Sequence, residues 1–108
     1  MSRYFNRAGE TLTLEGWCAL GDAGYRIVKQ EDVGDYWVST VWLGLNHNYG
    51  DGPPLIFETM VFGREAAGKS GDECFCERYS TEAQAVAGHS RVVEGVRDGT
   101  LALYGDAA

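Results

Sequence analysis

Four ionisable residues of this sequence are suited to acid–base or metal chemistry: His47, Asp51, Glu58 and His89. Histidine titrates near neutral pH, and a carboxyl group in apolar surroundings can acquire a pKa suited to proton transfer. Glu58 is the one charged side chain within two long apolar segments, and His89 falls in an apolar stripe nearer the end of the chain. Glu58 and His89 are therefore the candidate catalytic residues.

Both candidates also have a structural interpretation. A carboxylate buried without a partner costs several kcal/mol or has a raised pKa, so Glu58 would instead lie at a sheet edge or bind Arg, Tyr or Trp donors. A histidine in the middle of a helical stripe is commonly a core residue that bonds to the backbone. The sequence leaves these alternatives open for Glu58 and His89.

A polar, glycine-rich segment from Asn46 to Gly52 separates the two apolar segments and ends at the double proline Pro53-Pro54. Loops of this composition bind ligands or metals, or else their Asn and Gly residues simply supply the left-handed backbone angles of a long turn. The candidate ligand- or partner-binding residues are Asn46, His47, Asn48, Tyr49 and Asp51 in the loop, and Trp42 in the segment before it.

No metal site or cofactor is predicted. Cys74 and Cys76 would point to one face of a strand, but structural zinc sites favour two to four residues between paired cysteines. A Cys–His nucleophile pair would need His47 or His89 to reach Cys18 or Cys76 in the fold. The sequence contains no phosphate-binding glycine loop, Gly-x-Ser-x-Gly elbow or His-Glu-x-x-His motif.

The helices and strands expected from the sequence, which must position these residues, indicate an α+β fold in one domain over residues 1–108. A hydrophobic fraction of 44% with six Tyr, four Phe and three Trp is typical of a globular chain. We expect strands at 25–31, 36–45, 55–63 and 73–79, paired as a four-stranded antiparallel meander. Segment 64–72 is expected to be a mobile connection.

Capping residues predict the helices. Thr13 precedes a short N-terminal helix over 14–20, and Gly21 ends it. A short strand and turn at 4–9 precede it. A capping box from Thr81 to Gln84 begins the one long C-terminal helix, which ends at Asp98-Gly99. Its expected apolar stripe consists of Ala85, Val86, His89, Val92, Val93 and Val96. Leu101, Leu103 and Tyr104 are expected to dock after it, and residues 105–108 to fray.

The two long apolar segments are expected to form a β-hairpin with a loop over 46–53. Symmetric pairing sets Leu45 opposite Pro54, Trp42 opposite Phe57, Val41 opposite Glu58 and Thr40 opposite Thr59. One face then carries Val38, Thr40, Trp42, Leu55, Phe57, Thr59 and Val61; the other carries Ser39, Val41, Leu43, Leu45, Ile56, Glu58, Met60 and Phe62. Since one long helix covers one face, the second needs a homodimer or partner surface, or the N-terminal segment with its short helix.

Charge limits the classes of partner. Nine basic and sixteen acidic side chains give a net charge of −7, and no basic stripe offsets it, so nucleic-acid binding is not expected. No apolar run approaches the roughly 20 residues that span a bilayer, and an odd number of cysteines suits a reducing compartment. We expect a soluble, cytoplasmic protein without membrane association, whose partners are proteins, itself or small molecules.

The run STVWLGLNHNYGDGPPLIFETMVFG at 39–63, followed by RYSTEAQAVAGH at 78–89, resembles a family of small uncharacterised proteins encoded by bacteriophages, prophages and actinobacteria. The resemblance implies a phage-type accessory protein made in the host cytoplasm, and it brings no established activity. Such proteins often act by binding.

The favoured hypothesis is accordingly a binding protein that uses the apolar hairpin and the 46–52 loop to engage a protein, a second copy of itself or a small ligand. The alternative is a small hydrolase-like or metal-dependent enzyme that uses His47, Asp51, Glu58 and His89, which must then converge in one pocket. A third possibility is a virion component.

Overall fold

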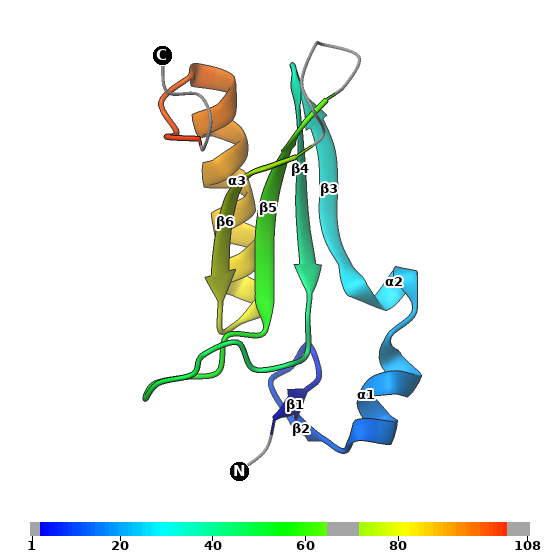
Figure 1. Ribbon diagram of the computed structural model, residues 1–108. Coiled ribbons are helices and arrows are strands. Elements are labelled where there is room, and N and C mark those ends of the chain that lie inside the picture. The colour runs from blue at the N-terminus through cyan, green and yellow to red at the C-terminus, as the bar shows by residue number, and fades with distance from the viewer. Residues whose placement is uncertain (1–2, 65–71, 104–108) are drawn as a thin grey trace.

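The computed structural model describes residues 3–64 and 72–103 and confirms the α+β fold (Figure 1). Four antiparallel strands form the main sheet in the order β3–β4–β5–β6, which is the expected meander. Its strands are β3 (Ile27–Val33), β4 (Tyr36–Trp42), β5 (Phe57–Gly63) and β6 (Glu73–Tyr79). The other elements are β1 (Tyr4–Phe5), β2 (Thr11–Leu12), α1 (Leu14–Leu20), α2 (Ala23–Arg26) and α3 (Glu82–Asp98).

The helix ends lie where the capping residues predict them. Thr13 Oγ1 accepts a hydrogen bond from Gly16 N at 3.0 Å and begins α1. Both bonds of the capping box at Thr81 and Gln84 are present, and Gly99 ends α3 with a φ of 71°. The helix boundaries are therefore set by local chemistry.

The register of the central hairpin is also confirmed, with Trp42 opposite Phe57 and Thr40 opposite Thr59. The strands are shorter than predicted, however, and the pair of Leu45 with Pro54 does not form. Gly44 turns the chain with a φ of 72°, and the N-terminal segment bonds there instead: Phe5 N donates to Gly44 O at 2.7 Å. The connection between β4 and β5 therefore spans 43–56 rather than 46–53.

The start of β3 differs from the prediction for a local reason. Asp22 accepts at its side chain from Tyr25 N at 2.8 Å and at its carbonyl from Arg26 N at 3.1 Å. These bonds draw Tyr25 and Arg26 into the helical turn α2, and β3 runs from Ile27 to Val33 instead of over 25–31. As a result Arg26 projects from a turn and not from the sheet.

Helix α3 covers one face of the sheet and encloses the core. The fully buried side chains on that face belong to β4 and β5, and they are Val38, Thr40, Trp42, Phe57, Thr59 and Val61. Ile56 was expected on the opposite face, but it lies before β5 and joins the core cluster around Trp42. The prediction for Val86 is also wrong, since it is 51% exposed. Gly88 is buried in the helix instead and leaves room for the Tyr79 ring.

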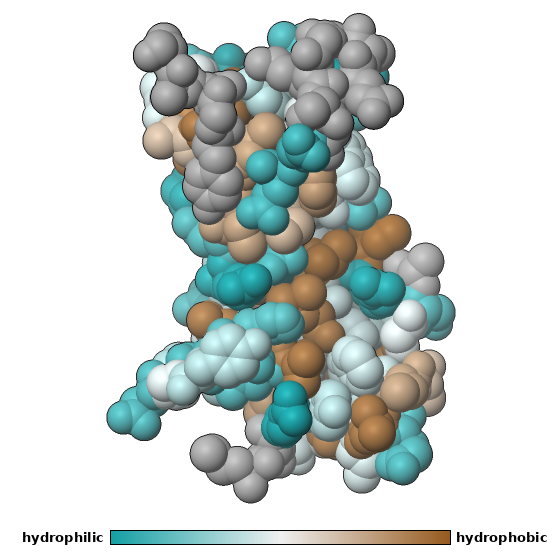
Figure 2. Space-filling view, viewed as in Figure 1, coloured by the Kyte–Doolittle hydropathy of each residue, from teal (hydrophilic) through white to brown (hydrophobic). Residues whose placement is uncertain are grey.

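Among the described residues, no helix lies across the other face, which we call the open face. It carries Gln30, Trp37, Ser39, Val41, Glu58, Met60, Phe62, Cys76 and Arg78. The Trp37 and Phe62 rings pack at 5.5 Å between centroids. Helix α1 and strands β1 and β2 gather beyond the end of β4 in Figure 1 rather than across this face. Figure 2 shows hydrophobic residues in a band on the side of the molecule turned away from α3.

After α3, Leu101 and Leu103 pack against the core cluster of Val33, Val38, Val61, Val92 and Val93, as expected for a docked final segment. Tyr104, residues 105–108 and most of the connection 64–72 lie outside the described residues.

Candidate functional site

The 43–56 connection forms an arm that projects from the end of the sheet (Figure 1). Its two asparagines hold its own backbone. Asn46 Oδ1 accepts from Asn48 N at 2.8 Å and from Leu55 N at 3.1 Å. Asn48 Oδ1 accepts from Gly50 N at 3.0 Å, and its Nδ2 donates to Pro53 O at 2.9 Å. The side-chain oxygens of both asparagines and Nδ2 of Asn48 are thus occupied within the arm. The turn interpretation is correct only in part, because no described residue other than glycine has a positive φ and the left-handed angle within the 46–52 loop is at Gly52.

Two of the predicted binding residues are exposed to solvent near the tip of the arm. Tyr49 is 90% exposed, and Asp51 is exposed two residues further on. The hydrogen bonds of Asn48 brace the backbone on either side of Tyr49. The structure therefore presents an aromatic ring and a carboxylate to solvent on a braced arm.

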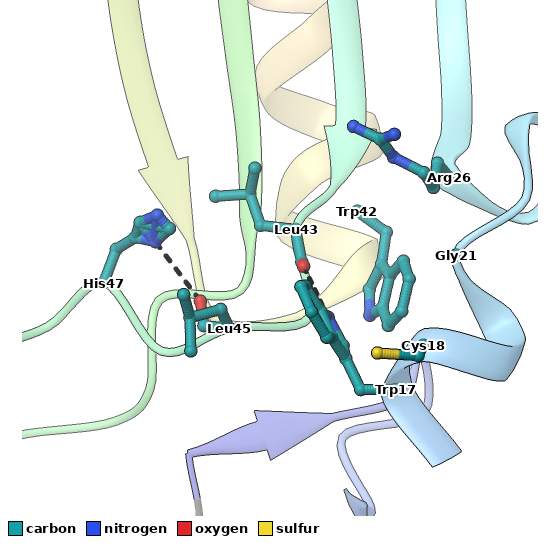
Figure 3. A pocket seen from close by; sticks show the side chains of 8 residues that line it. All are labelled: Trp17, Cys18, Gly21, Arg26, Trp42, Leu43, Leu45 and His47. Atoms are coloured by element: carbon teal, nitrogen blue, oxygen red, sulfur yellow. Dashed lines mark hydrogen bonds between the residues drawn. The ribbon is translucent and has the colours of Figure 1, made fainter. Parts of the chain in front are cut away.

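A pocket of about 400 Å³ lies at the base of the arm, between α1 and the end of β4 (Figure 3). Trp17, Cys18, Gly21, Arg26, Trp42, Leu43, Leu45 and His47 line it. Trp17 Nε1 donates to Leu43 O at 2.9 Å, and Trp42 Nε1 donates to Phe5 O at 2.9 Å. These bonds fix both indole rings. The pocket brings together Trp42 and His47, two of the predicted binding residues from different parts of the hairpin.

An ion pair between Arg7 and Glu82, which we call the Arg7–Glu82 clamp, fixes the segment that packs against Trp42 of this pocket. The Arg7 guanidinium binds both carboxylate oxygens of Glu82 in α3, at 2.7 and 2.9 Å, and Tyr25 O at 3.0 Å. The Tyr25 ring meets Trp42 edge-on at 4.8 Å between centroids. The hydrogen bond from Arg7 lowers the pKa of Glu82. This bidentate pair therefore ties the N-terminal segment to α2 and α3.

Glu58 lies on the open face and has partners for its charge. Glu58 is only 7% exposed. Its Oε2 atom accepts hydrogen bonds from Arg78 Nε at 3.0 Å and from Cys76 Sγ at 3.5 Å. The structure thus gives Glu58 the arginine donor of its structural interpretation.

Burial, and secondarily the nearby charge of Arg78, lowers the pKa of His47. His47 is therefore mainly neutral at pH 7.

Cys76 is expected to be a poorly reactive thiol, because burial and then the charge of Glu58 raise its pKa to about 11. Since the thiolate is the nucleophile, alkylation near pH 8 should be roughly a hundredfold slower than for a thiol of ordinary pKa. Timed labelling with iodoacetamide and peptide mass spectrometry would compare Cys76 with the exposed Cys18. Glu58→Gln should accelerate labelling of Cys76. Equal rates at Cys18 and Cys76 would contradict this assignment.

His89 lies in a buried chain of side-chain hydrogen bonds beneath α3. Thr40 Oγ1 lies 2.7 Å from His89 Nδ1 and 2.5 Å from Thr59 Oγ1, and His89 Nε2 lies 3.1 Å from Glu31 Oε1. His89 is a core residue 1% exposed, as its structural interpretation expects, although its partners are side chains rather than the backbone. The network gives hydrogen-bond partners to polar groups that would otherwise be buried unpaired between the sheet and α3, at a cost in stability.

The stability of the fold is expected to decrease as pH is lowered from about 7.5 to about 5. Burial lowers the pKa of His89 below its ordinary value of 6.5, although Glu31 opposes the shift. The unfolded chain then binds a proton more readily than the folded chain, so the contribution of His89 is present above pH 6.5 and is lost as pH falls below it. Urea unfolding at several pH values measures this loss.

Matched variants separate the two histidines. His47 contributes in the same direction, because its pKa is also lowered, and His47→Gln removes that part. Glu31→Gln should steepen the acid loss, since Glu31 raises the pKa of His89. An unchanged pH dependence in His89→Gln would show that His89 does not cause it.

The four residues of the enzymatic alternative do not all converge, although His47 and Glu58 lie within electrostatic range of each other. Neighbouring strand residues point to opposite faces, so Glu58 faces away from Thr59, Thr40 and His89. His47 lies at the base of the arm and Asp51 lies beyond Tyr49 near its tip. Within residues 3–64 and 72–103, no group of three or more His, Cys, Asp or Glu side chains is arranged to hold a metal ion.

Comparison with protein-family models, curated proteins and solved structures finds no match for this chain. The function must therefore be argued from the site itself. In the part of the chain that the structure describes, no helix is long and apolar enough to cross a membrane.

Sequence reasoning missed Trp17 and Arg26 in the pocket wall and Arg78 beside Glu58. It considered Cys18 only as a nucleophile paired with a histidine, and Cys18 and His47 both line the pocket. Trp17 carried a signal, because a tryptophan on a two-turn helix has to pack against something outside that helix. No sequence signal identified Arg26, since the direction of its side chain depends on the helical turn that begins at Asp22. The pairing of Arg78 with Glu58 follows from the β5–β6 register, which sets the two residues opposite each other.

Proposed function

We propose that the protein acts by binding a partner protein, and that the tip of the 43–56 arm makes the central contact. The observation that carries the proposal is the 90% exposure of Tyr49 on a backbone braced by Asn46 and Asn48. Tyrosine is enriched among residues that dominate binding energy, and a braced loop loses little conformational entropy on binding.

The state of the ionisable groups supports binding over catalysis. Glu58 is paired with Arg78, and His89 is enclosed between Thr40 and Glu31. A general base has to reach a substrate, whereas His89 has almost no exposed surface. The exposed chemistry of the arm is an aromatic ring and a carboxylate, which is suited to recognition.

Charge indicates the kind of partner. The net charge of −7 disfavours close approach of two copies at low ionic strength and favours a partner with basic groups. The proposed partner offers an apolar recess to Tyr49 and a Lys or Arg to Asp51. Self-association is the second candidate, favoured by the aromatic pair of Trp37 and Phe62 on the open face.

The proposal places the protein in the cytoplasm, as a phage-type accessory protein. Three free cysteines, Cys18, Cys74 and Cys76, support a reducing compartment. The resemblance noted in the sequence supplies the phage context.

Tyr49→Ala is expected to weaken partner binding at least about tenfold while the unfolding transition stays unchanged. Immobilised wild-type protein would capture the partner from a lysate of the source cell. Excess soluble wild-type protein should displace the partner, and Tyr49→Ala should not. Val86→Ala is the matched control, because it truncates an exposed apolar side chain on the outer side of α3.

Displacement by Tyr49→Ala at the wild-type concentration would overturn the proposal. Light scattering of the isolated protein decides the second candidate. A dimer mass that is lost in Trp37→Ser but kept in Tyr49→Ala would assign self-association to the open face.

A further inference from the structure

We infer that the pocket at the base of the arm binds a small organic anion with an aromatic body, such as an aromatic carboxylate. This pocket is separate from the exposed tip at Tyr49, so the inference goes beyond the proposed protein-binding function. Its volume of about 400 Å³ is within the range of small-molecule sites.

The wall of the pocket suits an apolar, flat body. The half-buried indole of Trp17 and the half-buried side chains of Leu43 and Leu45 supply this surface, and the fully buried indole of Trp42 backs it. Both indole N–H groups are already bonded to backbone carbonyls, which holds the rings and leaves the accessible apolar surface of Trp17 to the ligand. A ring stacked on this surface would displace water from apolar groups.

Arg26 determines the charge of the ligand. Its guanidinium extends above Trp42 towards Leu43 in Figure 3. Among the described residues it has no ion-pair or side-chain hydrogen-bond partner, although the chain has an excess of acids. Four other arginines each pair with an acid: Arg7 with Glu82, Arg64 with Asp32, Arg78 with Glu58 and Arg91 with Glu77. Arg3 and Arg97 have no ion-pair partner among the described residues either, but neither lines this pocket.

The remaining lining residues favour an anion over a cation. None of the described residues that line the pocket is Asp or Glu. His47 is not a ligand for the carboxylate, because its Nδ1–H donates to Leu45 O at 3.3 Å and Nε2 of the neutral ring is then an acceptor, suited to an O–H or N–H group elsewhere on the ligand. A cation would meet the unpaired guanidinium of Arg26, whereas a carboxylate can accept two parallel hydrogen bonds from it.

The test uses 2-naphthoate as the probe and the three indole N–H signals of the full chain in a nitrogen–proton correlation spectrum. Trp17 and Trp42 line the pocket, and Trp37 lies on the open face as an internal control. We expect saturable shifts of the Trp17 and Trp42 signals with a 1:1 stoichiometry, and no shift at Trp37.

Arg26→Gln is expected to weaken 2-naphthoate binding roughly tenfold, because it removes the charge-assisted contact. Arg97→Gln removes the same charge from the exposed end of α3 and should leave the affinity unchanged. The neutral probe 2-naphthamide should bind wild type and Arg26→Gln alike, which shows that the variant keeps the pocket. Tyr49→Ala should bind 2-naphthoate normally, so failure of the arm-tip proposal and failure of this inference are distinguishable.

Absence of saturable shifts at Trp17 and Trp42 would overturn the inference. Equal 2-naphthoate affinity in wild type and Arg26→Gln would overturn the assignment of an anion. Shifts confined to Trp37 would place the probe on the open face and would also overturn it.

Discussion

Gly44→Ala is expected to destabilise the protein by about 3 kcal/mol and to lower the Tm by more than about 10 °C. A Cβ at this position would lie 2.3 Å from Trp42 Cζ2 and 2.5 Å from Trp17 Nε1. Both indoles are held by hydrogen bonds to backbone carbonyls, so neither ring can move without losing a bond. The φ of 72° adds strain for any residue with a Cβ. Thermal unfolding followed by circular dichroism measures the loss.

Gly9→Ala is the matched control for this prediction. Gly9 also has a positive φ, of 86°, but a Cβ there would meet nothing within 4 Å. Its substitution should therefore cost only the backbone strain, about 1 kcal/mol. Equal losses in Gly9→Ala and Gly44→Ala would show that the contact with the two indoles contributes nothing.

The central hairpin shows how much of the fold the sequence determines. Alternation of side chains over 36–42 and 57–63 leaves one register that buries the apolar set, so Thr40 could be placed opposite Thr59 before the structure was known. The ends of the strands could not be placed in this way. Gly44 bonds to Phe5, which is far away in the sequence, and that contact replaces the local pairing of Leu45 with Pro54.

The candidate site was predictable in part, for a related reason. The composition of the 46–52 loop singled out His47 and Tyr49, and both are placed where recognition is possible. The pocket could not be foreseen, because its wall depends on α1 and α2. The Arg7–Glu82 pair, whose residues are 75 apart in the chain, holds α2, and the bond from Trp17 to Leu43 O, 26 residues away, holds α1. No local pattern encodes such a pair.

Residues singled out for catalysis turn out to have structural partners. The carboxylate of Glu31 can only accept hydrogen bonds when ionised, so His89 Nε2–H donates to it and Nδ1 becomes an acceptor. Thr40 O–H therefore donates to His89 Nδ1, and Thr40 Oγ1 accepts from Thr59 O–H. The network has one self-consistent direction at neutral pH. A protonated His89 would carry a hydrogen on Nδ1 and could no longer accept the hydrogen bond from Thr40 O–H. The loss of this bond adds to the expected loss of stability in acid.

This direction makes Thr40→Val more damaging than Thr59→Val, although both residues are fully buried and face each other. Thr40→Val leaves His89 Nδ1 without its donor and removes the oxygen that accepts from Thr59 O–H, at a cost of about 2–3 kcal/mol. Thr59→Val leaves the bond from Thr40 to His89 intact and should cost about 1 kcal/mol. Urea unfolding at neutral pH measures both.

The double variant tests the order of the network. With Thr40 already replaced, Thr59→Val removes a buried hydroxyl that has lost its acceptor, so it should cost nothing further or restore some stability. The double variant should therefore be no less stable than Thr40→Val. A cost for Thr59→Val as large as that for Thr40→Val, or additive losses in the double variant, would mean that the two hydroxyls act independently. In that case Thr40 would not be the link between the sheet and His89.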